Sequence, residues 1–185
     1  QLVTGPAHGA LSLNADKNIV IEGSDLSAGT ALNLQAGGDI TVAALALTSE
    51  ASTTGKGKDW AFSATENILT TLNAPNISVI STGEWGYGYD ATGELTDTAN
   101  ITFAGAQLDA QDSIAIAAYG GSAIFDTVQD LTYQSTQITT QGLFSNSSYA
   151  AQTYDLTNQI TQLTAGTIDI QAAGDLTALG TSFVT

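Results

Sequence analysis

Short runs of alternating apolar and polar residues recur along this chain, and turns of small residues separate them. Residues 32–47 read LNLQAGGDITVAALAL, where Leu32 and Leu34 enclose Asn33 and a second alternating run begins at Ile40. An apolar period of two is typical of β-strands, and the Gly-Gly-Asp turn between the runs first suggests a hairpin. The unit returns at a nearly constant spacing, however, so a repeat architecture is favoured over a series of hairpins.

The spacing of the repeat is a little over 20 residues. LSLNADKNIVI at 11–21 overlays LNLQAGGDITV at 32–42, and QAAGDLTAL at 171–179 matches QAGGDITVA at 35–43. A period of about 20 residues, built from short strands and small-residue turns, is the length of one coil of a β-solenoid. Helical repeats are excluded because the apolar spacing is two rather than three to four.

A lone Leu, followed two residues later by Ala, is a second repeated feature. It occurs at Leu26, Leu72, Leu108 and Leu163. Coils that stack about 4.8 Å apart align equivalent positions into ladders, so we expect these four leucines to point inward together. Asp39 and Asp175 each follow a Gly at an equivalent corner, and we interpret these acids as turn formers rather than ligands.

Three polar stretches interrupt the period, near 48–67, 81–100 and 127–159. They are longer than a corner and rich in Ser and Thr or, in the second stretch, in Gly and aromatic residues. Alternation such as Leu131 with Tyr133 favours paired strands over disordered loops. The sequence therefore predicts an all-β solenoid with polar hairpin or loop excursions.

Composition narrows the classes of partner. The chain has 18 acidic residues, three Lys and no Arg, and its formal net charge is −15. This charge argues against binding of nucleic acid or of an anionic membrane. No apolar run reaches the roughly 18 residues of a membrane span, so membrane insertion is not expected. The absence of Cys suits a chain that crosses an oxidising compartment before it folds.

These motifs resemble the haemagglutinin-repeat region of filamentous haemagglutinin-like exoproteins, the large adhesins and contact-dependent inhibition proteins of two-partner secretion. The family pattern is a lone Leu, Ala-Gly, an alternating strand, Ala-Gly-x-Asp and a second strand. Residues 26–44 and 163–183 match it, and residues 108–118 match its first half. The resemblance implies a right-handed parallel β-helix over 1–185, as one segment of a longer rod, secreted and displayed on a bacterial surface.

The resemblance also implies a function. A rod segment of this kind would be a structural shaft that gives an adhesive or toxic tip its reach, with flanking coils of the same chain as its partners. The family's secretion motif and C-terminal toxin are not found in the sequence, so neither activity is expected here.

An alternative is a module that binds a carbohydrate or a receptor on a host or neighbouring cell. Trp85, Tyr87 and Tyr89 lie between Glu84 and Asp90. An aromatic ring can stack on a sugar while carboxylates accept hydrogen bonds from its hydroxyl groups. The simpler interpretation is that these rings cover the side of the solenoid.

Enzymatic activity is not expected. Parallel β-helices include polysaccharide lyases and glycosidases, and the latter use paired carboxylates. A lyase also needs Lys or Arg to stabilise an enolate, and this chain has no Arg. His8 is the only His and there is no Cys, so neither a zinc site nor a Ser-His-Asp triad is predicted.

Glycosylation and calcium binding remain as alternatives. Asn76, Asn100 and Asn146 begin glycosylation sequons, and Asn146 is favoured because it lies in a polar excursion. No cofactor is expected. Structural Ca²⁺ is retained as an alternative because oxygen ligands are plentiful, although no calcium-loop motif occurs.

Overall fold

The computed structural model describes residues 2–3, 9–55, 57–83, 99–141 and 145–185, and all regular secondary structure in these ranges is β-strand. This confirms the all-β prediction. The chain divides into two compact units. Unit 1 comprises Gln1–Leu45, Ile68–Val128 and Ile160–Thr185, and unit 2 comprises Ala46–Asn67 and Gln129–Gln159. The sequence-based division into one repeat segment with excursions stays a prediction.

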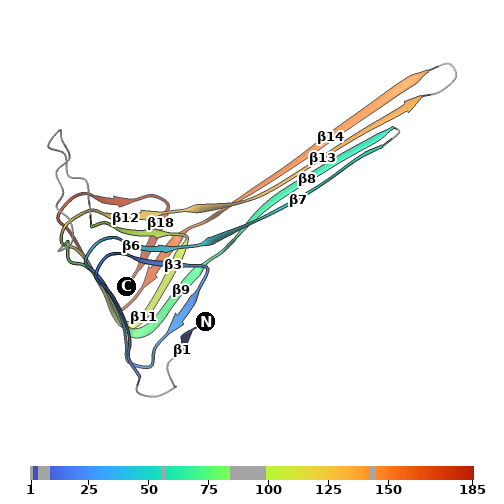
Figure 1. Cartoon of the computed structure of the whole chain (residues 1–185). Coiled ribbons are helices and arrows are strands. Elements are labelled where there is room, and N and C mark those ends of the chain that lie inside the picture. The colour runs from blue at the N-terminus through green and yellow to red at the C-terminus, as the bar shows by residue number, and fades with distance from the viewer. Residues whose placement is uncertain (1, 4–8, 56, 84–98, 142–144) are drawn as a thin grey trace, which may run out of the picture. The chain divides into compact units, whose positions relative to one another are not determined.

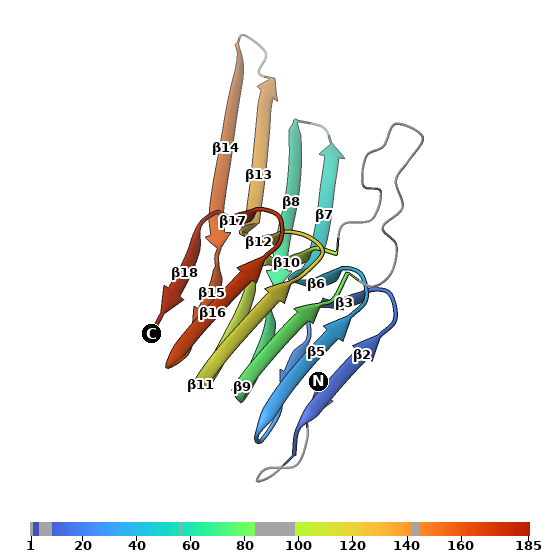
Figure 2. The ribbon, with the colours of Figure 1, turned by 90° about the vertical axis from the view of Figure 1, so that its left-hand side faces the viewer.

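Unit 1 is built from strands that pair in parallel with the equivalent strands of the neighbouring repeats (Figures 1 and 2). We call one pass of the chain through three strand positions a layer. The described residues form the layers β2–β3–β4, β5–β6–β9, β9–β10–β11, β11–β12–β15 and β16–β17–β18. The long strands β9 and β11 each supply the third position of one layer and the first position of the next.

The strands of unit 1 are β1 (Leu2–Val3), β2 (Leu11–Ala15), β3 (Ile19–Glu22), β4 (Asp25–Ser27), β5 (Ala31–Ala36), β6 (Ile40–Ala43), β9 (Thr70–Ser81), β10 (Ile101–Ala104), β11 (Ala106–Ala118), β12 (Ala123–Asp126), β15 (Thr161–Thr164), β16 (Thr167–Ala172), β17 (Leu176–Ala178) and β18 (Thr181–Val184). β1 pairs in parallel with β4.

The first strand position carries the shift of 21 residues that the sequence predicts. Leu11 pairs with Leu32, and Leu13 pairs with Leu34. The ladder of Leu32 then continues through Ile77, Ile114 and Ile168. β5 and β6 belong to different sheets, so the Gly-Gly-Asp segment between them turns a corner and is not a hairpin.

The second position holds the largest side chains of the core. Phe103 pairs with Val42 on one side and with Phe125 on the other, and both rings are fully buried. Their centroids are 5.3 Å apart with nearly parallel planes, and Phe183 meets Phe125 edge-on at 5.5 Å. Phe103 and Phe125 thus stack because they occupy equivalent positions, whereas Phe183 comes from the third strand position, where it pairs with Leu163.

The third position confirms the predicted leucine ladder. Leu26 pairs with Leu72, Leu72 with Leu108, and Leu108 with Leu163. All four side chains are buried, with exposed fractions of 5% or less. The four leucines therefore share one environment, as the repeated Leu-x-Ala motif requires.

The corner between the second and third strand positions has two different forms, which alternate from layer to layer. In the first, third and fifth layers the chain turns at Gly23, Gly105 and Gly180, whose φ angles are 53°, 60° and 56°. A Cβ on Gly105 would also lie 2.5 Å from Val128 Cγ2, so glycine is needed there for conformation and for space. In the second and fourth layers the chain leaves unit 1 at this corner and later returns.

Unit 2 is a four-stranded sheet in the order β14-β13-β8-β7 (Figure 2). Its strands are β7 (Leu45–Gly55), β8 (Lys58–Ile68), β13 (Val128–Gln141) and β14 (Asn146–Gln159). The polar stretches near 48–67 and 127–159 thus form paired strands. β8 and β13 pair antiparallel, from Lys58 opposite Ile138 to Thr65 opposite Leu131, and this pairing joins the two excursions into one sheet.

Candidate functional site

The aromatic and acidic residues that the sequence singles out lie outside the described residues. These are Glu84, Trp85, Tyr87, Tyr89 and Asp90. His8 lies outside them as well. A ligand site on this segment therefore stays a prediction.

The sequon asparagines occupy different settings. Asn76 is exposed within β9, and its Oδ1 accepts a hydrogen bond of 2.8 Å from Ser113 Oγ. Asn100 is half-buried just before β10, and its Oδ1 accepts a hydrogen bond of 2.8 Å from the Ser122 N–H. Asn146 begins β14. Modification at any of the three stays a prediction.

A polar ladder, which sequence reasoning missed, lines the corner between the first and second strand positions. Asn18 Oδ1 accepts the Asp39 N–H at 2.9 Å, and Asp39 Oδ1 accepts the Asn100 N–H at 2.8 Å. Asn100 Oδ1 accepts the Ser122 N–H at 2.8 Å, and Ser122 Oγ accepts the Asp175 N–H at 2.9 Å. Each layer thus satisfies a backbone donor of the next layer.

The signal for this ladder was present in the sequence. Each member directly precedes the second-position strand of its layer, in NIVI, DITV, NITF, SAIF and DLTA. All five residues carry an oxygen acceptor on a short side chain, although they are of three different types, Asn, Asp and Ser. The ladder also supports the interpretation of Asp39 as a structural corner residue.

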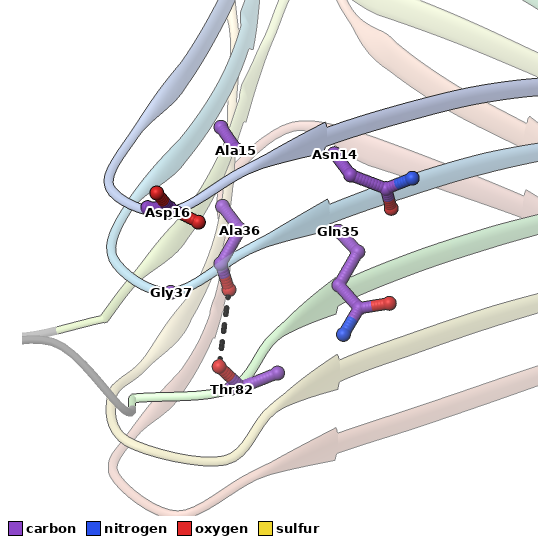
Figure 3. Close-up of a pocket in the computed structure, with 7 residues that line it drawn as sticks. All are labelled: Asn14, Ala15, Asp16, Gln35, Ala36, Gly37 and Thr82. Atoms are coloured by element: carbon purple, nitrogen blue, oxygen red, sulfur yellow. Dashed lines mark hydrogen bonds between the residues drawn. The ribbon is translucent and has the colours of Figure 1, made fainter.

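A surface depression of about 390 Å³ lies next to this corner (Figure 3). Its lining residues come from β2, from β5 and from the corners that follow β2, β5 and β9: Asn14, Ala15, Asp16, Gln35, Ala36, Gly37 and Thr82. Asn14 on β2 pairs with Gln35 on β5, and Thr82 Oγ1 donates to the Ala36 carbonyl at 3.4 Å. Two neutral amides and one carboxylate are groups that hydrogen-bond to hydroxyl or amide groups of a ligand.

Unit 2 carries aromatic pairs on both of its faces. Trp60 stacks on Phe62 with ring centroids 6.2 Å apart, and Tyr133 meets Tyr154 edge-on at 6.4 Å. Phe62 lies opposite Gln134 and Tyr133 lies opposite Ser63, so strand alternation places the two pairs on opposite faces. Tyr154 is 66% exposed.

A hydrogen-bonded carboxylate connects three strands of unit 2. Gln159 Nε2 donates to Asp130 Oδ2 at 2.6 Å, and the backbone N and Nδ2 of Asn67 donate to Asp130 Oδ1 at 2.7 and 2.9 Å. The Gln159 bond lowers the pKa of Asp130, partial burial opposes this shift, and the two Asn67 bonds lower the pKa further. β8, β13 and β14 therefore meet at one ionised carboxylate.

The described residues lack two other kinds of functional feature. They contain no group of three or more His, Cys, Asp or Glu side chains placed to hold a metal ion. They also contain no helix long and apolar enough to span a membrane.

Comparison with known proteins assigns the family. The family model of the hemagglutinin repeat matches residues 4–100, which is more than half of the chain. The chain belongs to the hemagglutinin-repeat family. No curated protein and no solved structure gives a significant match. The match confirms the resemblance to filamentous haemagglutinin that residues 26–44 carry.

Membership in the hemagglutinin-repeat family sets the functional context. It indicates a segment of a filamentous haemagglutinin-type adhesin or exoprotein, and it suggests a secreted or surface-exposed protein. This family is generally non-enzymatic adhesin material. The matched residues include the first two layers and the depression of Figure 3.

Proposed function

We propose that this hemagglutinin-repeat chain is a shaft segment of a secreted, surface-displayed filamentous adhesin or toxin-delivery exoprotein. The layers of unit 1 would be successive coils of a right-handed parallel β-helix, and each coil would lengthen the shaft by about 4.8 Å. The work of the segment is then mechanical reach, and its main partners are flanking coils of the same protein.

The ladder Leu26–Leu72–Leu108–Leu163 carries this proposal. Residues separated by 36 to 55 positions in sequence lie in register and buried, so the same inward position recurs from layer to layer. Such a core is continuous along the stack, and its stability is nearly a sum of contributions from neighbouring layers. A repeat built in this way can be lengthened without redesign, which suits a shaft.

An exchange experiment tests the shaft role. In the complete exoprotein, this segment is replaced by a segment from another part of the same rod with the same number of layers. A shaft predicts that attachment or delivery is retained, because only length matters. Loss of attachment despite normal export and surface display would contradict the shaft role.

Binding of a neutral glycan or a receptor is the second candidate function. The depression of Figure 3 supports it, because Asn14, Gln35 and Asp16 supply hydrogen-bonding groups on the outer surface. The 84–90 segment remains the other candidate site. A glycan array would compare the unchanged chain with Trp85→Ala and with the double variant Asn14→Ala/Gln35→Ala. Loss of a glycan signal in one variant alone would locate the site, and no signal from the unchanged chain would count against glycan binding.

A further inference from the structure

The two outer strands of unit 2 present long, unprotected edges. Within the described residues, β7 pairs only with β8, and β14 pairs only with β13. β7 has 11 residues, all exposed, and β14 has 14 residues. Edge strands are usually protected by Lys, Pro, bulges or short length, because their free N–H and C=O groups can pair with another strand. Neither β7 nor β14 contains Lys, Arg or Pro.

Acidic residues are not concentrated on these edges. β7 contains one acidic residue, Glu50, and β14 contains one, Asp155, which is close to the average density of a chain with 18 acidic residues in 185. An acidic molecule that avoids self-association would be expected to place its charge where strands can add. The two edges do not concentrate acidic residues in this way, so each presents a single carboxylate to an added strand.

The chain already uses one junction of this kind. β8 is the second strand of the first hairpin and β13 is the first strand of the second hairpin, and they pair over eight residue pairs. In this junction a large side chain faces a small or flexible one, as for Trp60 opposite Thr136. No short turn joins these two strands, because 59 residues separate β8 from β13.

The outer edges repeat these features. β14 is again a second hairpin strand, and it exposes the large side chains of Tyr149, Tyr154 and Leu156 at 61%, 66% and 47%. β7 is again a first hairpin strand, and its middle, SEASTT, is made of small and polar residues apart from Glu50. The strand directions alternate across the sheet (Figure 2), so a β7 strand added beside β14 would continue the antiparallel order.

We propose that β14 of one copy pairs antiparallel with β7 of a second copy of this chain. The interaction is a strand addition in which main-chain hydrogen bonds supply affinity and cross-strand side chains set the register. Because the two edges differ, the contact is head-to-tail, and it adds copies until it is blocked. The acidic copies repel one another, so screening by salt strengthens the association.

Sedimentation velocity tests this over a roughly hundredfold range of protein concentration, at low salt and at about 0.5 M NaCl. Species larger than dimers should appear as concentration rises, and their fraction should increase with salt. A chain that remains monomeric at every concentration and salt, or that associates less as salt is added, would overturn the proposal.

Edge-blocking variants locate the contact. Proline is tolerated on an edge strand only where the missing N–H pointed outward. Gln152→Pro and Thr153→Pro are therefore made separately in β14, and Ala51→Pro and Ser52→Pro in β7. Successive N–H groups of an edge strand point alternately outward and toward the neighbouring strand, so one proline of each pair removes an outward N–H and the other removes a bonded N–H. The variant whose neighbouring strand keeps its amide protection is the edge-blocked form. The other variant serves as its folding control. Each edge-blocked form should be monomeric. Val20→Pro should leave association unchanged, because Val20 is an exposed residue of β3 in unit 1.

Mixing the two edge-blocked forms gives the decisive result. Each form retains one functional edge, so an equimolar mixture should form dimers and nothing larger. A β7-blocked form that still dimerises alone would show symmetric β14–β14 pairing and would overturn the head-to-tail contact. A mixture that stays monomeric under conditions where the unchanged chain associates would overturn it as well.

Discussion

Individual residues matter in this fold through the ladder in which they stand. Leu34 is 1% exposed and lies between Leu13 and Val79 of the neighbouring layers. Asn33, one residue away, points outward, and its Nδ2 donates to Ser12 Oγ at 3.3 Å. Adjacent residues of one strand therefore belong to different environments, which is the basis of the first prediction.

Leu34→Asp should destabilise unit 1 by about 3 kcal/mol or more, because it buries a carboxylate among apolar side chains in a chain with no Arg and only three Lys. Asn33→Asp introduces the same side chain on the outer face and should cost less than about 1 kcal/mol. Hydrogen exchange of both variants measures the difference. Equal loss of protection in β5 would mean that inward and outward positions are not distinct.

The corner ladder makes a second residue-level prediction. Asp39→Ala removes the acceptor of the Asn100 N–H and should cost about 1–2 kcal/mol, with faster exchange of the Asn100 amide. Asp39→Asn keeps an oxygen acceptor at this position and should retain most of the stability. If both variants lose equal amide protection at Asn100, the stability of the corner depends on the charge of Asp39 and not on its oxygen acceptor.

At the scale of elements, the hairpins of unit 2 depend on polar contacts more than the layers of unit 1 do. Asp130 receives donors from Asn67 on β8 and from Gln159 on β14, so one carboxylate links both hairpins. No side chain of β8 or β13 is fully buried. A small number of hydrogen bonds therefore has a large share in holding this sheet together.

This arrangement gives unit 2 a defined pH dependence. The pKa of Asp130 is lowered in the folded state, chiefly by Gln159. Its ionised form therefore contributes stability above the ordinary carboxyl pKa of about 3.9, and this stability is lost as pH falls through the lowered folded value. The urea midpoint reported by Trp60 fluorescence, in a Trp85→Phe background, should fall with pH in this acid range.

Asp130→Asn should remove most of this acid sensitivity and lower the midpoint at neutral pH. Asp155→Asn, which removes the same charge from β14, serves as the matched control and should retain the pH dependence. An acid transition of unit 2 that is unchanged in Asp130→Asn would mean that other carboxylates govern it.

At the scale of the whole molecule, the alternation of corners predicts that unit 1 folds without unit 2. The third layer passes from Ala104 to Ala106 through Gly105 alone. A single Gly that replaces residues 44–69, and another that replaces residues 127–160, would give the second and fourth layers the same turn. The ladders of unit 1 keep all of their paired residues after these changes.

The doubly shortened chain should keep a cooperative unfolding transition and a far-ultraviolet spectrum typical of β-sheet. Its amide protection in β5, β9 and β11 should match that of the unchanged chain. The control replaces the same segments by single Ala residues, which disfavour positive φ and should destabilise the two corners by about 1–2 kcal/mol each. A shortened chain that fails to fold, with either residue, would mean that unit 2 is required for unit 1.

The sequence by itself determined the ladder positions of unit 1. Alternation with a period of two separates inward from outward residues, and the lone Leu followed by Ala marks the third strand position in four layers. Burial of Leu, Ile, Val and Phe is a strong and local preference, so a short motif is enough to specify it.

Only the tertiary structure decided which polar groups bond to one another. The corner ladder of Asn, Asp and Ser residues has no single residue type, and its bonds join backbone to side chain across layers. The junction of β8 with β13 is likewise invisible along the chain, because Ser- and Thr-rich strands with two exposed faces specify neither partner nor register. Apolar periodicity reports what is buried, whereas the pairing of polar strands depends on which segments the folded layers bring within reach.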